Sequence, residues 1–213
     1  MKRMLPAALA VLLISFLMAG CMVRVDKDEK GQEKKVEVDS PFGHVHVNTD
    51  ETNPADLGLP AYPGAQQVKD DDDHKSADVN VGFGQWEIKV KAISYLTPDS
   101  RDKVVAFYKK ALGNFGTVIA CQDSVAVGKP TVTSEGLTCN DDNSMSNVQV
   151  KTHKDDKGVT INTGKSGQGF QLKAGSKHHQ HILGIEESTD GKTHFALVAI
   201  DLPSDLDKKK DKD

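Results

Sequence analysis

Period-two alternation recurs along this sequence and requires a fold that contains a β-sheet. Trp86, Ile88 and Val90 alternate with charged residues over 86–96, the pattern of a strand with one buried face. Further strand patterns follow at 117–121, 136–140, 148–153, 159–163, 170–174, 180–186 and 193–201. Residues 195–200 are apolar at every position, which predicts a central strand covered on both faces.

One segment has a helical period instead. Val104, Phe107, Tyr108 and Ala111 lie at i, i+3, i+4 and i+7, so they share one face of a helix. The preceding Thr-Pro-Asp-Ser at 97–100 supplies an N-cap and a proline for the first turn, and a glycine at 113 can end the helix. We therefore expect an α+β domain, an antiparallel sheet with one long amphipathic helix packed on a face.

The first residues indicate export. Two basic residues, an apolar run over 5–17 and small residues at 19 and 20 precede Cys21. This pattern resembles the signal peptide of bacterial lipoproteins, with cleavage after residue 20 and lipid on Cys21. Met22 is not aspartate, which by the same resemblance favours the outer membrane. Two alternatives stay open, an uncleaved helix over the apolar residues 4–23 and cleavage by ordinary signal peptidase.

The rest of the chain divides into three parts. Residues 21–56 are polar and predict a tether, with a hairpin at 35–48 around a turn-forming Asp-Ser-Pro-Phe-Gly. The globular domain is expected over 57–203. The charged residues 204–213 predict a disordered tail.

The cysteine count fits an oxidising compartment. Of the three cysteines, lipidation of Cys21 would leave Cys121 and Cys139 as one pair. We expect a disulfide between them, and the alternative is two buried thiols.

Charge and motifs exclude several classes of function. The net charge of −4 and an aromatic content of 5% argue against nucleic-acid binding. The sequence contains neither Gly-x-Ser-x-Gly nor His-Glu-x-x-His, so we expect no enzyme.

Histidines are the one unusual feature. His44 and His46, like His179 and His181, are two residues apart in strand-like segments, so each pair can point to one face. Two such pairs would supply the four ligands of a structural zinc site if they met. The alternative is that they are surface residues, in which case no cofactor is bound or zinc is held weakly.

A family resemblance rests on three segments. These are Leu-Pro-Ala-Tyr-Pro-Gly-Ala at 59–65, Asp-Ser at 99–100 with Lys-Val-Val-Ala-Phe-Tyr at 103–108, and the closing strand at 195–200. They resemble uncharacterised Gram-negative envelope lipoproteins with a YPGA-type motif and a D-S-x-x-K-V-x-x-F-Y helix. The resemblance covers most of residues 57–202 and implies an envelope lipoprotein, without implying an activity.

Together these features predict a lipid-anchored protein of the bacterial envelope whose domain faces the periplasm or the exterior. Its partners are the membrane, through the N-terminal lipid, and another envelope protein that the domain binds or scaffolds without catalysis. The alternatives are a histidine-based metal-binding protein and an unrecognised hydrolase.

Overall fold

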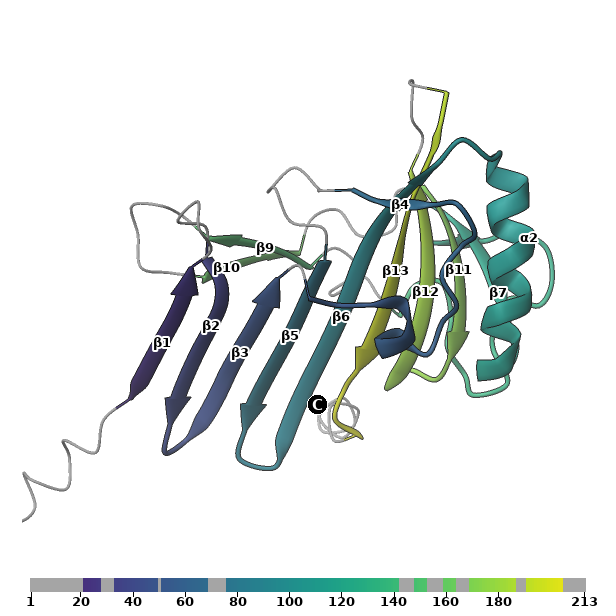
Figure 1. Cartoon of the computed structure of the whole chain (residues 1–213). Helices are drawn as coiled ribbons and strands as arrows, with labels where there is room; N and C mark the ends of the chain where they lie inside the picture. The colour runs from purple at the N-terminus through teal and green to yellow at the C-terminus, as the bar shows by residue number, and fades with distance from the viewer. Residues whose placement is uncertain are drawn as a thin grey trace, which may run out of the picture.

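The computed structural model describes residues 21–27, 33–49, 51–68, 76–141, 148–152, 159–163, 169–186 and 191–204. Most of these residues form one antiparallel sheet of 11 strands, drawn in Figure 1. Its strands are β1 (Met22–Lys27), β2 (Glu33–Ser40), β3 (Gly43–Thr49), β4 (Gln66–Gln67), β5 (Ser76–Phe83), β6 (Trp86–Thr97), β7 (Ile119–Gln122), β8 (Val125–Ala126), β11 (Phe170–Gly175), β12 (His179–Glu186) and β13 (Thr193–Asp201). The order across the sheet is β1-β2-β3-β5-β6-β13-β12-β11-β7-β8, and β4 pairs with β6 beside this path.

The remaining elements are few. Strands β9 (Val148–Thr152) and β10 (Val159–Thr163) pair only with each other. The helix α2 covers Arg101–Leu112, and short 3-10 turns cover Pro54–Leu57 and Gly113–Phe115. In the described part of the chain no helix is long and apolar enough to cross a membrane.

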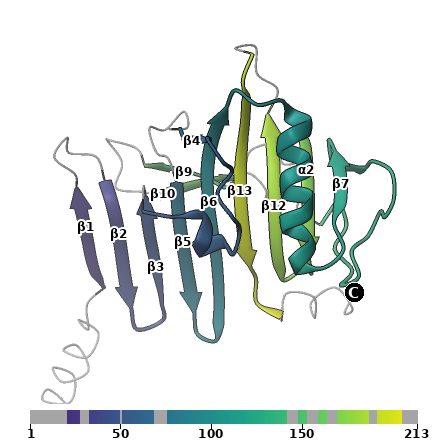
Figure 2. The ribbon, with the colours of Figure 1, turned by 45° about the vertical axis from the view of Figure 1, so that its right-hand side comes forward.

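The expected α+β fold with a long amphipathic helix is wrong. Among the described residues the structure is mostly antiparallel sheet, with 54% strand and one short helix, 15 residues long when its 3-10 extension is counted. A helix is about 10 Å across and covers about two strands, whereas ten strands side by side span about 43 Å. Figure 2 shows α2 in front of β12, with β1, β2 and β3 left without a helix over them.

The sheet buries an apolar cluster on each face, because β13 lies at its centre. Phe195 and Leu197 point to the face of α2, where they pack with Tyr108 and Leu112 of the helix. Ile200 points to the opposite face. It packs there with a row of apolar residues from neighbouring strands: Val36, Val47, Val79, Val90 and Ile182. The apolar sequence of this strand therefore predicts its central place correctly, between β6 and β12.

The two motifs that carry the family resemblance contact each other. The Tyr62 hydroxyl of the YPGA segment donates to Asp99 Oδ2 over 2.9 Å, just before Ser100, the N-cap of α2. Lys103 donates to Asp99 Oδ1 over 2.8 Å, and this hydrogen bond lowers the pKa of the Asp99 carboxyl. Tyr108 donates to the carbonyl of Pro60 over 3.2 Å. Both motifs thus hold the helix on the sheet.

The disulfide Cys121–Cys139 is present, with the two Cα atoms 5.7 Å apart. It links β7 to a loop, since residues 136–140 do not form the strand that the sequence predicts. The side-chain hydroxyl of Thr133 stabilises this loop: it accepts a hydrogen bond from the Leu137 amide over 2.9 Å and donates one to the Gly175 carbonyl of β11 over 2.7 Å. The buried Lys173 donates to the Cys139 carbonyl over 3.1 Å.

The N-terminal segments belong to the sheet. In the expected hairpin, Lys35 pairs with Asn48 and Ser40 pairs with Gly43. Strand β3 pairs onward with β5, and β1 begins at Met22, directly after Cys21. The expected leader, residues 1–20, and all of the expected tail 204–213 except its first residue lie outside the described residues.

Leu197 tests the central strand, because its side chain is fully buried against α2. Leu197→Ala should lower the free energy of unfolding by about 2–5 kcal/mol, measured by urea denaturation of the oxidised chain. The exposed Val127 provides the control, and Val127→Ala should change that free energy by less than about 0.5 kcal/mol. Equal losses in the two variants would contradict a core centred on β13.

Candidate functional site

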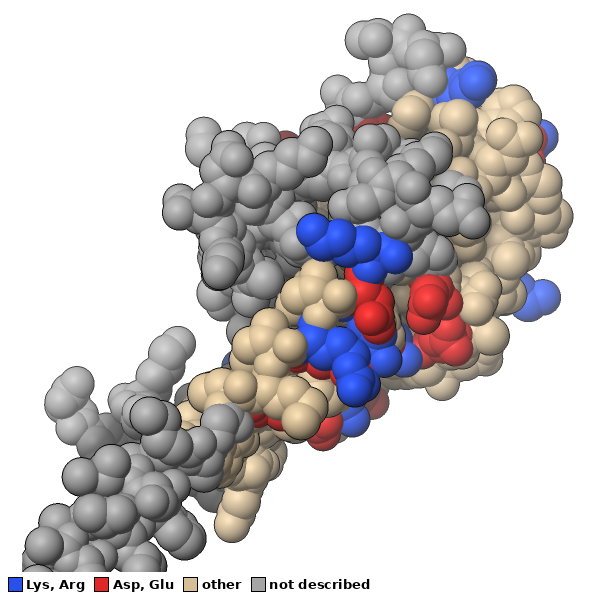
Figure 3. Space-filling view, turned by 60° about the vertical axis from the view of Figure 1, so that its left-hand side comes forward, with Lys and Arg blue, Asp and Glu red and all other residues tan. Residues whose placement is uncertain are grey.

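Half of the sheet carries a broad polar surface that α2 does not cover. In the middle of β2 and β3, valines at alternate positions point to the opposite face, so the residues between them share this one. We call this surface the polar face. Its residues are Arg24, Asp26, Lys35, Glu37, Asp39, His44, His46, Asp78, Asn80, Glu87, Lys89 and Lys91. Figure 3 shows basic and acidic side chains interleaved on this side of the molecule.

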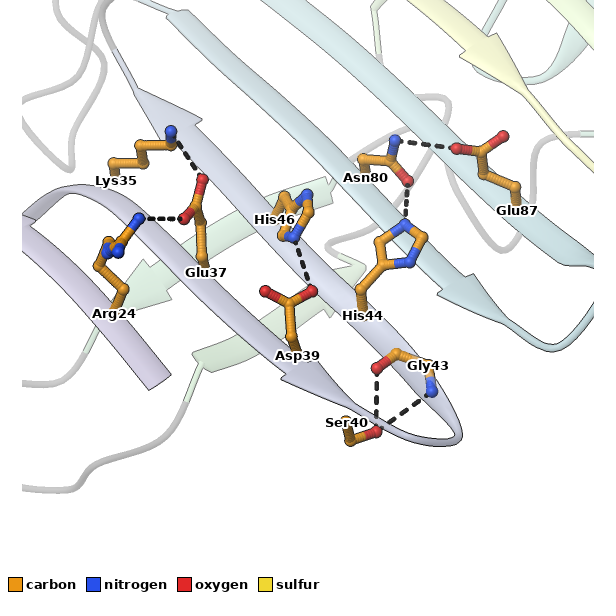
Figure 4. Close-up of polar contacts among 10 residues, drawn as sticks. All are labelled: Arg24, Lys35, Glu37, Asp39, Ser40, Gly43, His44, His46, Asn80 and Glu87. Carbon is orange, nitrogen blue, oxygen red and sulfur yellow. Dashed lines mark hydrogen bonds and ion pairs between the residues drawn. The ribbon is translucent and has the colours of Figure 1, made fainter. Parts of the chain in front are cut away.

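Basic and acidic side chains form ion pairs on the polar face. Lys35 donates to Glu37 over 2.6 Å, and Arg24 lies 3.7 Å from the other carboxylate oxygen of Glu37 (Figure 4). The hydrogen bond from Lys35 lowers the pKa of the Glu37 carboxyl. Further along the face, Lys89 pairs with Glu87 at 3.1 Å and Lys91 with Asp78 at 3.4 Å. Four basic and five acidic residues give the face a net charge of −1 while its histidines are neutral.

The two histidines of β3 join this network. His44 Nε2 lies 3.2 Å from Asn80 Oδ1, and the Asn80 amide donates to Glu87 over 3.0 Å. His46 Nε2 lies 3.1 Å from Asp39 Oδ1. A side chain at Gly82 would collide with the His44 ring, so glycine at this position lets the imidazole lie across β5. Each ring is thus oriented by a partner on a neighbouring strand (Figure 4).

A cleft of about 430 Å³ opens at one end of the polar face. Its walls come from two turns, β2–β3 and β5–β6, which present the aromatic side chains of Phe42 and Trp86. His44 and Glu87 supply its ionisable groups. The cleft can therefore offer aromatic contact and a few hydrogen bonds to a ligand.

The two histidine pairs, 44 with 46 and 179 with 181, lie far apart in the sheet. His46, Asn80, Lys89, Asp201 and His179 form one row across five neighbouring strands, so the two histidines are about 19 Å apart at about 4.8 Å per strand. Over the described ranges, no three His, Cys, Asp or Glu side chains are grouped to hold a metal ion. The four nitrogens of the zinc hypothesis do not converge.

His179 and His181 have separate environments. His179 Nδ1 lies 2.8 Å from Asp201 Oδ1 at the exposed start of β12. The His181 ring stacks on Phe115, with ring centroids 3.6 Å apart and planes inclined by 14°. Burial lowers the pKa of His181, against smaller contributions from Asp201 and from a hydrogen bond with the Leu57 backbone that raise it.

The aromatic residues at the turns were missed by reasoning from the sequence, which singled out only the histidines His44 and His46 of β3 in this region. A signal was present, because Phe42 sits inside the turn-forming segment 39–43, where large apolar residues are uncommon. Trp86 was assigned only to the buried side of a strand, yet its side chain lines the cleft.

Comparisons with known proteins found no match among protein-family models, curated proteins or solved structures. The resemblance to envelope lipoproteins therefore stays a prediction from the sequence. What the chain does has to be argued from the chemistry of its surfaces.

His181 predicts a pH dependence of stability. Because its pKa is lowered in the fold, the unfolded chain binds more protons as pH falls through about 6.5, the ordinary value for histidine. The stability that the neutral His181 side chain contributes should be fully present above that pH and decline below it. In urea denaturation between pH 7.5 and 5, His181→Phe should give a shallower decline than the unaltered chain. Leu197→Ala removes no titrating group and should keep the slope; an unchanged slope in His181→Phe would contradict the assignment.

Proposed function

We propose that this chain is a lipid-anchored protein of the bacterial cell envelope whose sheet domain binds or scaffolds another envelope protein, without catalysing a reaction. The sequence from Lys2 to Cys21 supports the anchor, and the polar face supports the binding role.

The polar face is the observation that carries the proposal. It extends over β1, β2, β3, β5 and β6, and its charged groups alternate in sign across neighbouring strands. Such a surface selects a partner by matching charges rather than by net attraction. At its margin, β1 is the last strand of the sheet in the described part of the chain, so its outer backbone groups are open to pairing with an extended segment of a partner.

The cleft supports binding more than catalysis. Its histidine, His44, is held by Asn80, and its carboxylate, Glu87, accepts from Asn80 and Lys89. The nearby Ser40 hydroxyl donates to the Gly43 carbonyl and accepts from the Gly43 amide, at 2.9 and 3.1 Å, so it closes the turn. The hydrogen bonds of these three side chains thus stabilise the turns and strands. A catalytic nucleophile would instead need a hydrogen bond to its general base.

A photo-cross-linking residue tests the binding surface in intact cells. Placed at Arg24, which is exposed on β1, it should form a covalent adduct with one discrete envelope protein. Lys109 is exposed on α2 and is the matched control position, where no such adduct should form. Equal adducts at both positions, or none at position 24, would argue against the polar face as the partner site.

Cys21 tests the anchor. Cys21→Ser should prevent lipid attachment, so the protein should leave the membrane fraction or accumulate as an uncut precursor. The measurements are fractionation, intact mass and incorporation of labelled palmitate. Unchanged membrane association with the leader retained would instead establish an uncleaved helix as the anchor.

A further inference from the structure

The register of the sheet aligns one end of five strands. Met22 pairs with Asp39, Asp39 with His44, His44 with Gly82 and Gly82 with Glu87. These residues therefore form a single row across β1, β2, β3, β5 and β6. Beyond that row, on the same side, come Cys21 and the two turns at 40–43 and 83–86. We call this margin the tip edge; it is the lower margin of β1 to β6 in Figure 1.

The tip edge exposes aromatic side chains. Phe42, Phe83 and Trp86 have exposed fractions of 75%, 67% and 40%, and Met22 beside Cys21 is 63% exposed. No other phenylalanine, tyrosine or tryptophan in the described ranges is exposed. The other large apolar side chains that are exposed are valines: Val23, Val25, Val125, Val127 and Val132. Water-exposed aromatic residues gathered at one margin mark a contact surface.

The position of Cys21 indicates what this surface contacts. The apolar leader of the sequence ends at Cys21, and β1 starts at the next residue without a linker. Whether the chain is held by lipid on Cys21 or by an uncleaved apolar helix, the bilayer begins beside the tip edge. Strands about 4.8 Å apart put Trp86, on β6, about 19 Å from β1, so a membrane at Cys21 is within reach of both turns.

We propose that the tip edge rests on the lipid bilayer, with Phe42, Phe83 and Trp86 inserted between headgroups and acyl chains. The inference rests on the proposed anchor and adds a second contact to it. Tryptophan and other aromatic side chains favour this interfacial zone, where an apolar ring and a polar neighbourhood are both satisfied. The paired charges of the polar face begin at the row behind the turns and stay in water.

This contact would orient the domain. Strand β6 has 12 residues and rises about 40 Å from the tip edge, at about 3.3 Å per residue. The polar face would then stand upright from the membrane and be open from the side, where a neighbouring envelope protein can reach it. A single flexible attachment at Cys21 would leave that orientation free.

Trp86 is the only tryptophan of the chain, so its fluorescence reports on the tip edge alone. The full anchored chain is reconstituted into phosphatidylcholine vesicles, with or without bromine on the upper acyl carbons. We expect the vesicle-bound chain to emit at shorter wavelength than the urea-unfolded chain in buffer without detergent. Brominated vesicles should remove most of the emission intensity, and acrylamide in the water should quench it only weakly. Phe42→Ser combined with Phe83→Ser should reduce the bromine quenching.

A matched reporter provides the control. Trp86→Phe with Val127→Trp moves the tryptophan to the loop after β8, the strand at the opposite margin of the sheet, and bromine should not quench it. Circular dichroism checks that each variant keeps its sheet. Flotation with the vesicles reports the anchor separately. A chain that floats while bromine leaves Trp86 unquenched overturns the bilayer contact and leaves the anchor intact. A chain that does not float contradicts both proposals, and burial of Trp86 without bromine quenching assigns the tip edge to a protein contact instead.

Discussion

Strand β13 buries both of its faces, and the rest of the structure depends on that constraint. Residues 195–200 have no polar side chain to turn to water, so apolar partners are needed on each side of the sheet. Helix α2, held by the Tyr62–Asp99 hydrogen bond, covers one side around Phe195. On the other side, Ile200 joins a cluster that continues through the valines of β5 and β3. The N-terminal strands are thus part of the second core.

That second core explains the polar face. Valines at alternate positions of β2 and β3 pack in the second core on one side of the sheet. Because successive side chains of a strand point to opposite faces, the residues between these valines lie on the other side. Helix α2 lies over the other half of that side and leaves these residues uncovered, so they have to be soluble. Directly opposite pairs such as Arg24 with Glu37 keep neighbouring strands from repelling one another. The same alternation therefore produces both a core and a surface suited to recognition.

Local patterns predicted local structure, and they failed where distant segments meet. The helix begins within the expected capping segment, after Ser100, and ends before Gly113, although Pro98 lies before the N-cap and not in the first turn. The cysteines pair as expected. The size of the sheet was not predictable, because β5 carries Asp78, Asn80 and Gly82, which disfavour strands, and is stabilised by pairing with distant strands and by packing of Val79 in the second core. The expected strand at 136–140 failed for the opposite reason. Its apolar residues reach the core from a loop tied by side-chain hydrogen bonds, which no period reveals.

The candidate surfaces follow from topology more than from any motif. In an antiparallel meander, the start of the first strand lies at the same end as the turn after the second strand and the turn after the fourth. Here those are Met22 of β1, the β2–β3 turn and the β5–β6 turn, with β5 next to β3 in the sheet. An anchor at the beginning of β1 therefore lies at the same end of the sheet as both turns, so that both are within reach of the membrane. Aromatic residues at those turns are then favourable in contact with lipid, whereas in water they would expose apolar surface without any compensating burial.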